Sequence, residues 1–167
     1  PDERILERAR AKLAATGVRC ELHRGYLRDA AALLWPLQPT KIVSSLVLHQ
    51  VPLAEKRAGL AAIHAALVPG GELHIADYGL QRTRAMRTLF KLVQCVDGFA
   101  DTQPNADGLV PLLMREAGFA EVAETAVIPT LTGSISLYRG RRRAASHSRG
   151  DTPSFCVNTR DSAEALA

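Results

Sequence analysis

The sequence is poor in cysteine and contains no long uncharged apolar run. Its cysteines, Cys20, Cys95 and Cys156, lie far apart, with neither a Cys-x-x-Cys pair nor an accompanying histidine pattern. This spacing provides no structural zinc site and favours a reducing compartment. The first residues are charged, and no segment resembles a signal peptide or a membrane span. We therefore expect a cytoplasmic protein with no transmembrane segment and no metal.

The length and composition fit one globular domain. The chain has 167 residues, of which 47% are apolar and 23% charged, close to the averages for soluble globular proteins. The net charge of +4 comes largely from a short run of arginines, Arg139, Arg141, Arg142 and Arg143. Such a run either contacts phosphates without sequence specificity or forms a solvated boundary of the fold, and we favour the second interpretation. No specific nucleic-acid partner is expected.

Helical and strand periodicities alternate through the first half of the chain. Apolar residues at three- and four-residue steps predict helices, and short alternating or continuous apolar runs predict strands. The nearly continuous run at 41–48 is typical of a strand covered on both faces. This alternation predicts an α/β fold with parallel strands. The expected elements are helices at 2–15, 29–35 and 52–67, and strands at 18–23, 41–48 and 72–77.

The second half of the chain begins with a basic amphipathic helix at 83–97. We expect this helix to pack on the core with a solvated basic face, although such helices also lie on membrane surfaces or bind anionic substrates. A loop through 101–104 then leads to a helix at about 107–117. Strands at 119–127 and 134–139 are expected to pair in antiparallel fashion. The folded domain is expected to span 1–140, and a disordered polar tail 141–167.

Two stretches carry a resemblance to a known family. Residues 41–51 read KIVSSLVLHQV, and residues 65–77 read AALVPGGELHIAD. Together they resemble the fourth strand, the following helix and the fifth strand of class I S-adenosylmethionine-dependent methyltransferases, and the late strand pair resembles the end of that family's sheet. The resemblance implies S-adenosylmethionine as the cofactor. It also implies an incomplete Rossmann-like sheet, mostly parallel with an antiparallel C-terminal strand pair.

The family's glycine-rich cofactor loop and ribose-binding acid have no counterpart in the chain, because both would precede Pro1. We therefore expect the chain to be the carboxyl-terminal part of the domain. Two family strands that lie between the strands at 18–23 and 41–46 are also missing. The sheet is expected to have a gap, so that either the strand at 18–23 pairs with a non-native neighbour or two strand edges stand exposed and promote association. Cofactor binding by this chain alone is expected to be weak or undetectable.

The resemblance also assigns candidate cofactor residues at the carboxyl ends of strands, where ligands bind in α/β sheets. Tyr26 and Leu27 occupy the place of an acidic segment that contacts the adenine in the family. Ser44 and Ser45 match the position that contacts the methionine end of the cofactor. The alternatives are an ordinary loop tyrosine and small residues that let the strand end pack tightly.

His49 and Asp77 are the candidate catalytic residues. Histidine titrates near neutral pH and can act as a general base, but it can also be held by local hydrogen bonds. Asp77 ends the expected strand at 72–77, where it either faces a substrate or caps the following segment. The resemblance implies methyl transfer to a small-molecule acceptor. The alternative is a catalytically inactive methyltransferase-like binding protein.

Overall fold

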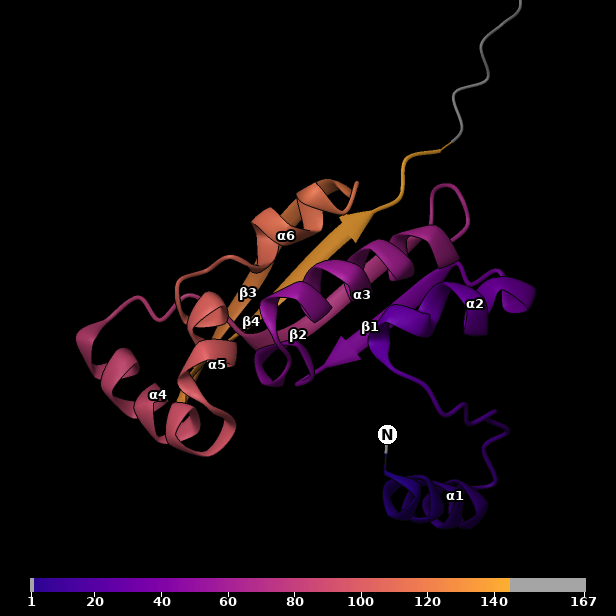
Figure 1. Cartoon of the computed structure of the whole chain (residues 1–167), viewed down its shortest axis with the longest axis horizontal. Helices are drawn as coiled ribbons and strands as arrows, with labels where there is room; N and C mark the ends of the chain where they lie inside the picture. Colours follow the sequence, from indigo (N-terminus) through magenta and orange to yellow (C-terminus); the bar gives the residue numbers. More distant parts are fainter. Residues whose placement is uncertain (1, 145–167) are drawn as a thin grey trace, which may run out of the picture.

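Four strands form one mixed sheet in the computed structural model, which describes residues 2–144 (Figure 1). The spatial order of the strands is β1-β2-β4-β3. β1 and β2 are parallel, whereas β4 is antiparallel to both β2 and β3. The predicted parallel pair and the predicted antiparallel C-terminal pair are therefore confirmed. The strands are β1 (Lys41–Ser45), β2 (Glu72–Tyr78), β3 (Ala120–Thr130) and β4 (Gly133–Arg141).

Most of the expected helices are present with bounds close to those predicted. The prediction of a loop through 101–104 is wrong, because this segment belongs to a helix that contains Pro104. Thr102, Asn105 and Ala106 of this helix are buried, so tertiary packing outweighs the missing proline N–H. The helices are α1 (Glu3–Thr16), α2 (Ala30–Leu34), α3 (Leu53–Ala66), α4 (Arg84–Asp97), α5 (Phe99–Ala106) and α6 (Val110–Glu116), with single 3-10 turns η1 (Leu27–Asp29), η2 (Trp35–Leu37) and η3 (Leu48–Gln50).

The connection from α3 to β2 explains how β1 and β2 come to lie side by side. Leu67 ends α3 in an extended conformation, and Gly70 adopts a positive φ of 83° that favours glycine. A side chain at Gly71 would approach the carbonyl oxygen of Val68 within 2.9 Å. The Pro-Gly-Gly turn thus lets the chain double back tightly. Strand pairing then aligns Lys41 with Glu72 and runs to Ser45 opposite Ala76.

The hydrophobic core lies between one face of the sheet and the helices α3 and α6, which cover that face together (Figure 1). β1 does not have the two covered faces that its apolar run predicted. Val43 is 73% exposed, and β1 is an edge strand with one neighbour among residues 2–144. The core side chains are Leu48, Leu60, Ile63, Leu67, Leu73, Ile75, Val110, Leu113, Met114, Phe119 and Tyr138.

The prediction of a strand at 18–23 is wrong, because this segment has no regular secondary structure. A strand needs backbone partners, and no strand among residues 2–144 pairs with this segment. The preceding helix α1 follows an Asp2 cap and ends at Thr16, close to the predicted 2–15, but it buries none of its residues. Figure 1 shows α1 lying apart from the sheet. The alternation of side chains therefore predicted a strand at 18–23, but no partner strand for it is present among residues 2–144.

The arginine run belongs partly to the fold. Arg141 ends β4 and its side chain pairs with Glu72 at 3.2 Å. The guanidinium of Arg142 donates hydrogen bonds to the carbonyl oxygens of His64, Ala65 and Leu67 at the end of α3. These contacts satisfy carbonyl groups that a helix end leaves free. The predicted tail therefore starts later than 141, and its part from residue 145 onward lies outside the described residues.

Purified residues 1–167 are expected to associate in a concentration-dependent manner, because the free edge of β1 and the exposed Val43 offer unpaired backbone and apolar surface. Sedimentation velocity measures this association. Val43→Glu is expected to shift the distribution toward monomer, whereas Leu131→Glu, at an exposed turn between β3 and β4, serves as the matched control. A monomeric wild-type chain that melts cooperatively would contradict this expectation.

Candidate functional site

The carboxyl ends of β1 and β2 lie next to each other because the two strands are parallel. Directly after β1, Leu46 adopts a left-handed conformation with φ of 53°, and its N–H donates to the carbonyl oxygen of Ala76 at 2.8 Å. Such a conformation costs a leucine roughly 1–3 kcal/mol and persists only where the surrounding structure enforces it. The strained turn sends the chain into η3, which carries His49.

Asp77, near the end of β2, is fully buried and holds η3 in place. Its Oδ2 accepts hydrogen bonds from the backbone N–H groups of Val47 at 3.0 Å and Leu48 at 2.7 Å. Its Oδ1 accepts from the N–H of Tyr78 at 2.8 Å and lies 2.7 Å from Nδ1 of His49. The carboxylate thus fixes the backbone just after β1 and at the end of β2, and it orients the imidazole of His49.

His49 is buried, and its contact with Asp77 shows which ring nitrogen donates a hydrogen bond. A carboxylate only accepts, so Nδ1 donates its hydrogen to Asp77. In the neutral ring this leaves a lone pair on Nε2, which lies 3.2 Å from the side-chain nitrogen of Gln50 and 3.4 Å from Oδ2 of Asp97. The ring of Tyr78 packs edge-on against the imidazole, with centroids 4.9 Å apart. His49 is therefore arranged to accept a proton at Nε2.

A cavity of about 370 Å³ lies beside His49. This volume is within the range of small-molecule sites in proteins. Its wall combines apolar side chains of α4 with polar groups from the strand ends and η3. The lining residues are Leu46, His49, Gln50, Tyr78, Leu92, Val93, Val96, Asp97 and Thr132. Asp77 is not among them, so its contact with the cavity is made through His49.

Lys56 of α3 is a further charged group near the site. The side chain is fully buried, and its Nζ donates to the carbonyl oxygen of Asp101 in α5. Burial lowers the pKa of Lys56, while the negative charges of Asp101 and Asp77 act to raise it. Its spacing with Leu60 and Ile63, at i+4 and i+7, is the sequence signal that places Lys56 on the buried face.

Tyr26 and Leu27 lie at the start of η1, away from the cavity lining. Tyr26 is exposed, its N–H donates to Asp29 at 2.8 Å, and the guanidinium of Arg28 stacks over its ring at 4.9 Å. Leu27 packs against α3 so closely that a side chain at Gly59 would come within 2.5 Å of it. Leu27 therefore anchors η1 on α3, and the exposed ring of Tyr26 is the group free to meet a ligand.

Ser44 and Ser45 end β1 on opposite faces. Ser44 is buried, and its Oγ has no hydrogen-bond partner among residues 2–144. Ser45 is exposed at the strand end, immediately before the strained Leu46. A buried hydroxyl without a partner is unusual in a folded protein. Neither serine lines the cavity beside His49.

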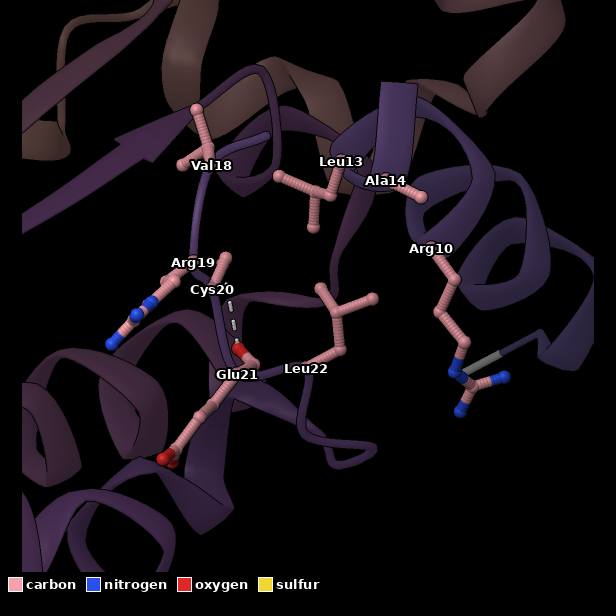
Figure 2. Close-up of a pocket in the computed structure, with 8 residues that line it drawn as sticks. All are labelled: Arg10, Leu13, Ala14, Val18, Arg19, Cys20, Glu21 and Leu22. Carbon is pink, nitrogen blue, oxygen red and sulfur yellow. Dashed lines mark hydrogen bonds between the residues drawn. The ribbon is translucent and has the colours of Figure 1, made fainter. Parts of the chain in front are cut away.

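A larger hollow of about 550 Å³ lies between α1 and the segment that follows it (Figure 2). Its walls are α1 and residues 18–22, which have no regular structure. Figure 2 shows side chains from the helix and from the extended segment facing each other across this space. The hollow contains no arrangement of the acid, base or nucleophile kind found at His49. We therefore place the candidate site at the strand ends.

Comparison with solved structures identifies the fold. An O-methyltransferase family protein from Burkholderia thailandensis matches with a TM-score of 0.64 and 23% identity, over 83% of this chain and 41% of that one. The fold is that of a class I methyltransferase domain, present in part. The apo S-adenosylmethionine-dependent methyltransferase SibL matches with a TM-score of 0.60 and 22% identity, over 83% of this chain and 40% of that one.

A third structure, of a protein that takes part in echinomycin biosynthesis, matches with a TM-score of 0.54 and 19% identity, over 84% of this chain and 63% of that one. The chain thus spans less than two thirds of each of these structures. No family model matches the sequence, and no curated protein matches it. Within residues 2–144, no helix is long and apolar enough to cross a membrane, and no cluster of side chains is suited to hold a metal ion.

Proposed function

We propose that this chain forms part of an S-adenosylmethionine-dependent methyltransferase that acts on a hydroxyl group of a small-molecule acceptor. The observation that carries the proposal is the His49–Asp77 pair, which stands at the carboxyl ends of two parallel strands beside a small-molecule-sized cavity. Methyl transfer needs few side chains, because the cofactor supplies an activated methyl group and the protein contributes positioning and desolvation.

The residues at the end of β1 fit one part of the cofactor. The exposed Ser45 leaves room for the methionine end to approach the backbone, and the small Ser44 beside it lets the strand end pack closely under the ligand. Tyr26 offers an exposed ring on which an adenine can stack. The 167 residues contain no glycine-rich strand-loop-helix, so these groups provide only part of the contacts that such a cofactor requires.

In the proposed reaction, His49 acts as the general base. Its Nε2 would accept the proton of the acceptor hydroxyl, and a bound S-adenosylmethionine would supply the methyl group to the acceptor oxygen. Asp77 acts as a positioning residue, because it holds the ring in the tautomer with hydrogen on Nδ1. The charge of the imidazolium that forms is stabilised by Asp77 and by Asp97 at 3.4 Å from Nε2.

The cavity favours a neutral or cationic acceptor with an apolar body. Leu92, Val93 and Val96 supply apolar walls, and Asp97 is the one ionised carboxylate in the lining. An anionic acceptor would place its charge next to Asp97 without a basic partner in the cavity. Phenols and other apolar alcohols therefore fit better than carboxylates or phosphates, and we propose a cytoplasmic small-molecule reaction rather than one on nucleic acid.

A titration with S-adenosylmethionine tests the cofactor assignment. The full product of the gene that encodes this chain is expected to bind the cofactor, and Ser45→Phe is expected to weaken that binding by roughly tenfold or more, equivalent to about 1.4 kcal/mol. Val43→Phe, on the same face of β1 but away from the strand end, is the matched control. Isothermal titration calorimetry measures both, and unchanged affinity in Ser45→Phe would contradict the proposed placement.

The alternative function is a methyltransferase-like binding protein without catalysis. In that case the role of Asp77 is structural, since its carboxylate already holds the backbone of η3 through Val47 and Leu48. The encoding DNA upstream of Pro1 separates the two: an in-frame glycine-rich strand-loop-helix supports the enzyme, and a start codon at this position supports the binding protein. We favour the enzyme, because His49 lines a cavity large enough for a small-molecule acceptor.

A further inference from the structure

Asp97 ends helix α4 as a carboxylate without a cationic partner. Its side chain is 23% exposed, so most of it is withdrawn from water. Among residues 2–144, no lysine or arginine nitrogen lies within 4.0 Å of this carboxylate, and the nearest basic group is the imidazole of His49, with Nε2 at 3.4 Å from Oδ2. In the neutral ring, Nε2 carries a lone pair and donates nothing to Asp97. A carboxylate removed from water in this way is stabilised by a cation or by hydrogen-bond donors.

The end of α4 adds to the negative potential at Asp97. The backbone dipoles of a helix leave a partial negative charge at its C-terminus, which basic side chains stabilise. The last turn of α4 contains no basic residue, and its final residue is itself an acid. Glu116 ends α6 in the same way, but there Arg115 lies in the last turn and Nε of Arg57 is 3.1 Å from the carboxylate. The end of α4 therefore attracts a cation that the described part of the chain does not supply.

This negative helix end faces the cavity beside His49. Asp97 lines the cavity together with the apolar side chains of Leu92, Val93 and Val96, and the lining contains no lysine or arginine. The carboxylate has two oxygens, of which Oδ2 lies toward Nε2 of His49. The other oxygen remains for a ligand. The cavity thus offers an apolar wall, a basic nitrogen and an unneutralised negative charge to a single small molecule.

We propose that Asp97 determines acceptor specificity and that the acceptor is an alcohol or phenol that also carries an alkylammonium group. The ammonium group binds Asp97, and the hydroxyl group faces Nε2 of His49. Hydrogen bonds between an ammonium and a carboxylate are stronger than those between neutral groups. Because Nε2 and Oδ2 are only 3.4 Å apart, the two polar groups of the acceptor are expected to lie close together. The reacting hydroxyl rests on the proposed function, whereas the ammonium site does not.

Three small phenols that differ mainly in charge test this preference without any methyl transfer. The compound ortho-(aminomethyl)phenol carries the ammonium group, ortho-ethylphenol has a methyl group in its place, and ortho-hydroxyphenylacetate carries a carboxylate. The full gene product is expected to bind the first at least about tenfold more tightly than the second. The third is expected to bind more weakly than either, because its charge would lie next to Asp97. Titrations followed by nuclear magnetic resonance measure the three dissociation constants.

Substitutions at Asp97 separate its charge from its shape. Asp97→Asn is expected to weaken binding of ortho-(aminomethyl)phenol about tenfold and to change binding of ortho-ethylphenol less than about twofold. Asp97→Glu keeps the charge and is expected to retain part of the preference. Glu116→Gln is the matched control, because it removes an acid from the end of another helix, outside the cavity lining, and is expected to change neither affinity.

Equal affinity of the wild-type protein for the ammonium and ethyl compounds would overturn the inference. So would a preference that survives Asp97→Asn, or one that is lost in Glu116→Gln. Such results leave the proposed function standing if the protein still methylates ortho-ethylphenol at a rate that depends on His49. Conversely, ammonium binding that depends on Asp97, in a protein that methylates neither phenol, would support the ammonium site and contradict the proposed function.

Discussion

His49→Gln is expected to lower kcat of the full gene product by about 10²–10⁴-fold, the usual contribution of a positioned general base. Glutamine can still donate a hydrogen bond to Asp77, but it provides no basic nitrogen at the position of Nε2. The affinity for S-adenosylmethionine is expected to change little, because His49 faces the acceptor cavity. Single-turnover rates with a phenolic acceptor and cofactor titrations measure the two effects separately.

His74→Gln provides the matched control. His74 lies on β2, on the opposite face from Asp77, with its side chain 40% exposed and paired with Glu72. Its replacement is expected to leave kcat within about twofold, because a surface substitution away from the site changes little. A rate in His49→Gln within threefold of wild type, in a protein that unfolds at the same urea concentration, would assign His49 a structural role only.

Asp77→Ala is expected to destabilise the protein by about 3 kcal/mol or more, because it leaves several buried donors without an acceptor. Asp77 accepts from the N–H groups of Val47, Leu48 and Tyr78 and from His49, and each buried donor without a partner costs roughly 1–3 kcal/mol. The losses are not additive, since η3 can relax toward solvent. Urea unfolding, followed by circular dichroism, measures the change in the free energy of unfolding.

Asp77→Asn separates the positioning role from the structural one. The amide oxygen can still accept from the backbone of Val47 and Leu48, so this variant is expected to lose less stability than Asp77→Ala. Its NH₂ group then faces Nδ1 of His49, which favours the ring with its hydrogen on Nε2 and removes the base. A stable Asp77→Asn variant with full activity would show that the tautomer of His49 does not matter. Nitrogen chemical shifts of the imidazole report the tautomer directly.

The His49–Asp77 contact shows which part of a site a sequence can predict. Both residues follow apolar strands, so their place at neighbouring strand ends could be expected from the parallel order of β1 and β2. Their 2.7 Å contact could not, because it depends on the left-handed turn at Leu46 that folds η3 back toward β2. No sequence pattern signals a positive φ at a leucine, since only the surrounding structure enforces it.

Lys56 and residues 18–23 show two other ways in which local pattern is insufficient. The spacing of Lys56 places it on the buried face of α3, but it does not show that α5 packs over it and supplies a carbonyl oxygen for its ammonium group. Residues 18–23 alternate as a strand does, but nothing among residues 2–144 pairs with them. In both cases the outcome depends on which distant segment lies alongside, and a one-dimensional pattern does not specify that.

The sequence by itself determined the order of elements from residue 29 to the end of β4 with the exception of α5, together with the parallel pairing of β1 with β2 and the antiparallel closing pair. Apolar periodicity and the Pro-Gly-Gly turn are local features, and they fix where a helix or strand begins and ends. Only the tertiary structure decided that β1 is an edge strand and that Asp77 accepts hydrogen bonds from the backbone of η3 and the residue before it. It also decided that α4 forms both a wall of the cavity and an exposed apolar face. These features arise from contacts between segments far apart in the chain, so they exist only once the sheet has assembled.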